Sequence, residues 1–285
     1  EIGVRLVGSE MCIRDRYGIA FDFSVPAVLI MLAFGLVGFL DDFIKVKRKR
    51  NLGLRAYQKI IAQLLLSFAA AYYAYKSSFI GSTLYDPIFG SIELGGWYIP
   101  FTMFMIIAVV NSANLTDGLD GLLSGVSLIY SIAMGVLFLY FAKVFDGSFI
   151  NEPRFVANRD GMLCMSVFAF AVAGGCLGFL KSNSYPAKVF MGDTGSMALG
   201  GAMSAMVIYS RSPFLFLLMG VCIVASAVSV VLQVGSFKLR HGKRIFKMAP
   251  LHHHFELLGY PETKVVSGYM IVTALACVAA LALFL

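Results

Sequence analysis

Three short segments of the sequence place carboxylates beside apolar stretches. The first, GFLDDFIKVKRKR, has Asp41 and Asp42 at the end of an apolar run, with Lys45 one helical turn farther on. The pair could be a helix end neutralised by its own basic tail, or a site for a metal ion or a phosphate. In a phosphate site, one acid could act as a base while Lys45 pairs with the phosphate.

The second segment, NSANLTDGLDGL, carries Asn114, Asp117 and Asp120 at regular intervals. On a helix these side chains share roughly one face, so we expect a polar stripe there. Gly118 and Gly121 would let a ligand or a neighbouring main chain approach closely. The alternative is a turn whose polar groups satisfy one another. Ligands that are all oxygen atoms favour Mg²⁺ over zinc.

The third segment, KSNSYPAKVFMGDTGS, predicts a turn at Asn183 and Pro186 before a new apolar stretch. Asp193 could cap the N-terminus of that helix, or the helix amides there could face an anion. Phe190 is either an aromatic residue at the membrane edge or a ring that stacks on a flat base.

A basic segment near the C-terminus ends in three histidines, in FKLRHGKRIFKMAPLHHHFELLGYPE. Its basic half could lie on an anionic lipid surface. Three consecutive side chains cannot point the same way on a helix, so we expect no three-histidine metal site. The histidines either contact a phosphorylated ligand or form a surface cluster.

The amino-acid composition indicates which kind of structural element positions these carboxylates, lysines and histidines. Of the 285 residues, 59% are hydrophobic and 14% are charged, whereas a soluble domain carries about 25% charged residues. The mean hydropathy is +0.82. These values exclude a soluble enzyme, a disordered chain and a secreted disulfide scaffold. The net charge of +7 is attributed to membrane topology and anionic lipids, not to binding of nucleic acid.

We therefore predict an all-α polytopic membrane protein. Eight apolar stretches are long enough, or nearly so, to cross a bilayer, and they lie near 25–40, 58–75, 98–112, 121–142, 161–180, 196–210, 214–234 and 265–285. A small extracytoplasmic hairpin is expected within 76–97. We expect residues 1–16 to be a leader foreign to the fold, and residues 17–285 to form a single transmembrane domain.

The basic residues orient these stretches. After residue 16, 15 lysines and arginines lie on one side of the predicted membrane and five lie on the other. The positive-inside rule makes the richer side cytoplasmic. All three aspartate segments and the histidines fall on that side, so phosphate chemistry at the headgroup level is expected, with one reactant a lipid.

The segments DDFIKVKRK, NLTDGLDGL, NSYPAKVFMGDTGS and GKRIFKMAPLHHHFELLG together resemble the bacterial phospho-N-acetylmuramoyl-pentapeptide transferase family. The resemblance covers about residues 20–285, and the histidine segment is its most specific part. It implies transfer of phospho-N-acetylmuramoyl-pentapeptide from the UDP-linked precursor to undecaprenyl phosphate, which gives lipid I and UMP in peptidoglycan synthesis. It also implies a homodimer in the inner membrane, with Mg²⁺ as cofactor and membrane lipids as partners.

The resemblance also implies roles for individual residues. Asp193 would be a Mg²⁺ ligand with Asp117 beside it. Asp41 or Asp42 would be the base or the lipid-phosphate contact, and His252 would join this catalytic set at the rim of the site. The substrate-binding residues that it implies are Lys45, Lys59, Asn114, Leu115, Asp120, Asn183, Phe190 and His253.

One departure from the family is visible in the sequence. The family has ten spans and an early loop with a Gly-Thr-Pro-Thr-Met-Gly-Gly-like run, whereas this sequence shows eight stretches and no such run. We expect that the first two family helices are missing or replaced by the leader. The rival interpretations are a transferase that uses UDP-N-acetylglucosamine and a cation or lipid transporter.

Overall fold

The computed structural model describes residues 23–49, 53–86, 90–144 and 159–283, and the leader predicted for residues 1–16 lies outside this part of the chain. The described residues are almost entirely helical. The long helices are α2 (Ser24–Arg48), α3 (Ala56–Lys76), α4 (Tyr98–Thr116), α5 (Leu122–Val144), α7 (Arg159–Asn183), α8 (Gly192–Ser210), α10 (Val221–Leu239) and α12 (Glu262–Ala282). The short elements are the 3₁₀ helix η1 (Gly95–Trp97) and the helices α9 (Pro213–Met219) and α11 (Leu251–Leu257).

The prediction of an all-α polytopic membrane protein is confirmed. Within the described residues, six helices are long and apolar enough to cross a membrane. Large apolar side chains such as Leu29, Leu32 and Leu36 are about half exposed on the outside of α2, as expected for a surface that faces lipid tails. The helices α3 and α8 are also long, but polar or small residues dilute their apolar character.

The predicted single span at 214–234 was wrong. The chain there forms α9 and α10, which meet at Gly220. A Cβ at Gly220 would lie 2.8 Å from the carbonyl oxygen of Phe216, so the two helices meet at a point where only a glycine fits without adjustment. The sequence stays apolar through this break, which is why it predicted a single helix there.

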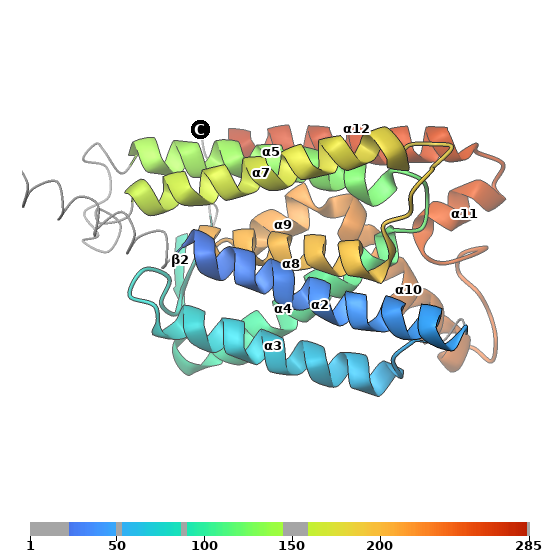
Figure 1. The fold of residues 1–285 in the computed structure, drawn as a ribbon, viewed down its shortest axis with the longest axis horizontal. Helices are drawn as coiled ribbons and strands as arrows, with labels where there is room; N and C mark the ends of the chain where they lie inside the picture. The colour runs from blue at the N-terminus through green and yellow to red at the C-terminus, as the bar shows by residue number, and fades with distance from the viewer. Residues whose placement is uncertain (1–22, 50–52, 87–89, 145–158, 284–285) are drawn as a thin grey trace, which may run out of the picture.

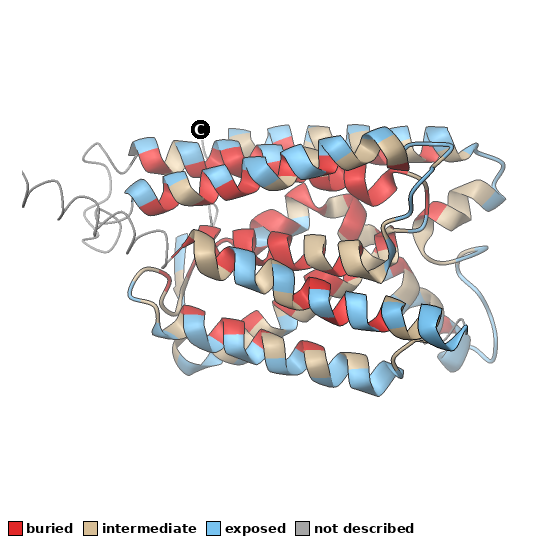
Figure 2. Ribbon diagram, viewed as in Figure 1, coloured by how far each residue is buried: buried red, intermediate tan, exposed pale blue. Residues whose placement is uncertain are grey.

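Helix α8 packs against both α2 and α4, and most of its residues are buried (Figure 2). Its small residues let the neighbouring main chains approach closely. A Cβ at Gly200 would lie 2.6 Å from the Cα of Val110 on α4, and one at Gly201 would lie 3.1 Å from the carbonyl oxygen of Ile30 on α2. This close packing fixes the first turn of α8, where Asp193 lies, relative to both partner helices.

The two ends of the bundle differ. The C-terminal ends of α2, α4 and α7 lie at the same end as the N-terminal ends of α3, α8 and α12 (Figure 1). At the opposite end, β1 (Thr83–Asp86) and β2 (Gly90–Glu93) form the antiparallel hairpin that the sequence predicted. All the aspartate segments therefore belong to one end of the bundle.

Candidate active site

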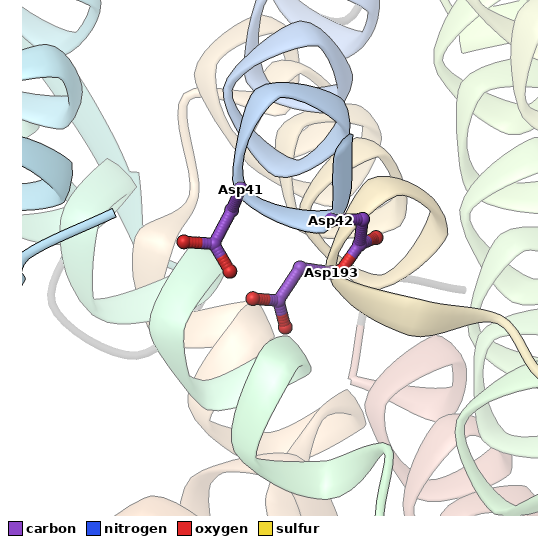
Figure 3. Close-up of side chains that lie close together, drawn as sticks. All are labelled: Asp41, Asp42 and Asp193. Carbon is purple, nitrogen blue, oxygen red and sulfur yellow. The ribbon is translucent and has the colours of Figure 1, made fainter. Parts of the chain in front are cut away.

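Three aspartates from two helices meet at this end of the bundle. Asp41 and Asp42 lie in the last turns of α2, and Asp193 lies in the first turn of α8 (Figure 3). One ligand atom from each carboxylate lies within 4.8 Å of the other two. These residues are 152 and 151 positions apart in the sequence, so only the packing of α2 on α8 brings them together.

The contact between α2 and α8 depends on Gly38. A Cβ at this position would overlap the carbonyl oxygen of Asp193, so the two helices can approach this closely only with glycine at position 38. Asp193 does not cap α8, because the N-cap residue is Met191 and has no side-chain capping bond. The carboxylate is instead directed toward the other two acids and their basic partners.

The ammonium group of Lys45 joins all three carboxylates. Its Nζ lies 2.6 Å from Asp41 Oδ2, 3.2 Å from Asp42 Oδ1 and 2.9 Å from Asp193 Oδ2. Lys59 from α3 adds a second ammonium 3.2 Å from Asp193 Oδ2. The acids therefore already hold a cation at their centre, which shows that the cluster attracts positive charge, and their oxygen donors are of the type that Mg²⁺ prefers. The cluster could hold a metal ion.

Backbone amides orient the two aspartates of α2 differently. Oδ1 of Asp41, a nearly buried side chain, accepts a 2.6 Å hydrogen bond from the N–H of Leu54. Oδ2 of Asp42 accepts hydrogen bonds from both the N–H and the hydroxyl of Thr194, each 2.8 Å long. Asp41 is thus anchored to the chain before α3, and Asp42 is anchored to α8.

Asn114 connects the second segment to this cluster. Its Nδ2 donates to Asp193 Oδ1 over 2.7 Å and to Ser196 Oγ over 2.9 Å. Asp193 therefore receives hydrogen bonds from α2, α3 and α4, and the amide of Asn114 is directed toward the acids. Leu115, the next residue, is half-buried.

The predicted helical stripe through Asn114, Asp117 and Asp120 was wrong. Helix α4 ends at Thr116, and Asp117 has a non-helical backbone with φ −77° and ψ 56°. The chain then turns through residues 117–121, where Gly121 has φ +76°. Asp117 and Asp120 accordingly lie on a turn, and their directions are set by the contacts of the turn and not by helical periodicity.

Asp117 lies close enough to the cluster for the charges of the other acids to affect its pKa. Burial and then the carboxylates of Asp193 and Asp42 raise the pKa of Asp117 to about 7. It is not one of the three acids whose ligand atoms gather, so its predicted role as a second metal ligand stays a prediction. A cation bound nearby would favour its charged form.

Asp120 and Asn183 bind the main chain of residues 184–191, the segment that carries Phe190. Asp120 Oδ2 accepts the N–H of Ala187 over 2.8 Å. Asn183 donates to the carbonyl oxygen of Val189 over 3.0 Å and accepts the hydroxyl of Ser124 over 2.8 Å. Phe190 itself is 75% exposed, so its ring is available for stacking. Direct contact of these three side chains with a substrate stays a prediction.

The three histidines have different surroundings, as their spacing required. His252 is fully buried, and neither ring nitrogen has a hydrogen-bond partner within the described part of the chain. Burial, with a smaller contribution from His253, lowers the pKa of His252 to about 4. His253 Nδ1 lies 2.6 Å from Glu256 Oε2, and His254 Nδ1 accepts the N–H of Lys247. His253 is therefore partly exposed, whereas His252 lies in the interior of the protein and not at a surface rim.

Two residues of this end were not singled out from the sequence. Thr194 holds Asp42, and its place directly after Asp193 was the available signal. Glu262 accepts the N–H of Asp120 over 2.6 Å, and only its position after Pro261 at a helix start could have drawn attention to it.

Comparison with known proteins adds to this geometry. The sequence model of glycosyl transferase family 4 matches residues 24–211. A protein of Clostridioides difficile (strain 630) named phospho-N-acetylmuramoyl-pentapeptide-transferase is 49% identical over 94% of this chain and 78% of its own length. Proteins of the same name from Clostridium novyi (strain NT) and Caldanaerobacter subterraneus are 45% and 47% identical, over 88% and 86% of this chain and 71% of each relative.

Proposed function

Because the chain belongs to glycosyl transferase family 4 and to its phospho-N-acetylmuramoyl-pentapeptide transferases, we propose that it makes lipid I. The donor is UDP-N-acetylmuramoyl-pentapeptide and the acceptor is undecaprenyl phosphate. A phosphate oxygen of the acceptor attacks the β-phosphorus of the donor, the bond to the bridging oxygen of the α-phosphate breaks, and UMP leaves. The alternatives, transfer from UDP-N-acetylglucosamine and transport, are not favoured by these relatives.

The observation that carries this proposal is the cluster of Asp41, Asp42 and Asp193 around two lysines at one end of the membrane helices. Transfer between two phosphorylated reactants needs neutralised charge and alignment more than covalent help. Lys45 and Lys59 can pair with phosphate oxygens when substrate enters. A transporter site would be expected near the middle of the membrane, whereas this cluster lies at helix ends.

We propose Mg²⁺ as the cofactor, held by Asp193 with Asp41 or Asp42, and with Asp117 nearby. When bound, the ion would neutralise and orient the diphosphate of the donor. Asp42 is positioned by Thr194 and Asp41 by Leu54, and one of the two would accept a proton from, or contact, the lipid phosphate. The exposed ring of Phe190 supports a stacking role beside the uracil base.

The positive-inside rule supports an inner-membrane protein with this site on the cytoplasmic face. We also propose that residues 17–285 act as one transmembrane domain and that two copies form a homodimer. Cross-linking of the detergent-solubilised protein, followed by mass determination, tests the dimer.

The experiment that tests the function is Mg²⁺-dependent UMP release in detergent with undecaprenyl phosphate as acceptor. The two donors to compare are UDP-N-acetylmuramoyl-pentapeptide and UDP-N-acetylglucosamine. Release from the muramoyl-pentapeptide donor alone supports the proposal. Release from UDP-N-acetylglucosamine would instead indicate that the protein is a UDP-N-acetylglucosamine transferase. Ion-driven flux in proteoliposomes without UMP release would instead support the interpretation of the protein as a transporter.

A further inference from the structure

A contact across 142 residues of sequence joins the start of α12 to the turn after α4. Oε1 of Glu262 accepts a 2.6 Å hydrogen bond from the backbone N–H of Asp120. Glu262 is half-buried in the first turn of α12. A carboxylate that accepts a backbone N–H makes a stronger hydrogen bond than a neutral acceptor. The contact therefore fixes the 117–121 turn to α12.

The 117–121 turn is also hydrogen-bonded to a third part of the chain, the segment 184–191. The carboxylate of Asp120 accepts the N–H of Ala187 over 2.8 Å. Two consecutive hydrogen bonds thus run from α12 through the 117–121 turn to the segment 184–191. The turn carries Asp117, proposed above to lie near the Mg²⁺ that would orient the donor diphosphate. The segment carries Phe190, proposed above to stack on the uracil base of the donor.

A second contact holds the same turn from the C-terminal part of the chain. The buried ring of His252 lies against Gly118, where a Cβ would overlap its Nε2 atom. The turn is therefore fixed at residue 118 by α11 and at residue 120 by α12. No helix of its own fixes this turn, because α4 ends at Thr116 and α5 begins at Leu122.

We propose that Glu262 is a positioning residue for the donor nucleotide. It acts through the main chain of Asp120, and it sets the distance between the Asp117 turn and the Phe190 segment without touching a reacting atom. The inference rests on the proposed transferase function. It predicts that loss of the acceptor oxygen weakens the use of the UDP-linked donor and leaves the use of undecaprenyl phosphate unchanged.

The test compares variants that separate the acceptor oxygen from the charge. Glu262→Ala removes both, and Glu262→Gln keeps an oxygen that can accept the N–H of Asp120. The double variant Glu262→Ala with Thr263→Glu keeps an acid in the first turn of α12, where it favours the helix dipole, but moves it one residue away from Asp120. Thr263→Ala is the control at a neighbouring exposed position.

The first readout is steady-state UMP release with each substrate varied in turn. Glu262→Ala should raise KM for the UDP-linked donor about tenfold, the effect of losing one charge-assisted hydrogen bond, while KM for undecaprenyl phosphate stays unchanged. Glu262→Gln should restore most of the loss, and the double variant should not. If Glu262→Ala does not fold, Glu262→Asp, whose shorter side chain falls short of Asp120, takes its place with the same expectation.

The second readout does not depend on activity. Amide hydrogen exchange without substrate should speed up at residues 117–121 and 184–191 in Glu262→Ala and stay at the wild-type rate in Glu262→Gln. Unchanged exchange and unchanged KM in Glu262→Ala would overturn the inference, as would rescue by the double variant. Absence of UMP release from the wild type would instead overturn the proposed function, because the exchange result stands by itself.

Discussion

The imidazole ring of His252 lies directly against Gly118, with no room between them for a Cβ. The two residues belong to α11 and to the turn after α4, and Gly118 directly follows Asp117 in that turn. The contact explains why a glycine stands between the polar residues of the second aspartate segment: any side chain there would displace the buried histidine.

The Gly118→Ala variant should therefore be less stable and less active. Gly118 itself is exposed, but its added methyl group would press on the buried ring of His252. Overpacking of this kind costs about 1–3 kcal/mol, and the displaced turn would carry Asp117 away from the cluster. The measurement is thermal unfolding in detergent together with UMP release. The matched control is Gly174→Ala on α7, where a Cβ meets nothing within 4 Å. Equal stability of the two variants would contradict the contact.

Removal of the Asp193 carboxylate should abolish turnover. Asp193 is the acid that Lys45, Lys59 and Asn114 all contact, and it is the proposed Mg²⁺ ligand. We expect Asp193→Ala and Asp193→Asn to lose more than about a thousandfold in kcat, as when a major source of charge stabilisation is removed, and to elute as folded protein. Near-normal turnover in either variant would be incompatible with the proposed site.

The hydroxyl of Thr194 should matter because it orients Asp42. Thr194→Val keeps the size of the side chain and the backbone N–H but removes the 2.8 Å hydroxyl hydrogen bond. We expect kcat to fall about tenfold, with Thr194→Ser close to wild type. The measurement is kcat at saturating levels of both substrates. A wild-type kcat in Thr194→Val would show that the N–H alone holds Asp42.

The buried His252 predicts a dependence of stability on pH. Burial lowers its pKa from the ordinary value of 6.5 to about 4 in the folded protein, so between these values the unfolded chain binds more protons at this residue. Its contribution to stability is thus complete above pH 6.5 and is lost as the pH falls toward 4. In His252→Gln, the unfolding temperature should vary less with pH over this window.

The comparison for that experiment is His254→Gln, since His254 lies in the same short helix but is not buried. That variant removes an imidazole from α11 at a position outside the interior, and so controls for the loss of a histidine as such. If His252→Gln and the wild type show the same dependence, the loss of stability in acid arises from other groups.

Much of the fold followed from the sequence because a bilayer imposes simple rules. Long apolar stretches must be helices that satisfy their own backbone groups, so seven of the eight predicted stretches each coincide with one long helix of the structure, and the hairpin was placed correctly. The same rules could not detect the break at Gly220, because two helices of equal hydropathy read as one.

The sequence by itself determined the chemistry of the candidate site: carboxylates, lysines and histidines on one side of the membrane, in motifs that a known family shares. Only the tertiary structure decided which of them meet. The cluster of Asp41, Asp42 and Asp193 exists because Gly38 lets α2 pack against the start of α8. The turn of Asp117 and Asp120 takes its direction from His252 and Glu262. Local spacing predicts which residues share a face of a helix. Beyond the end of a helix, contacts with distant parts of the chain determine where a side chain points.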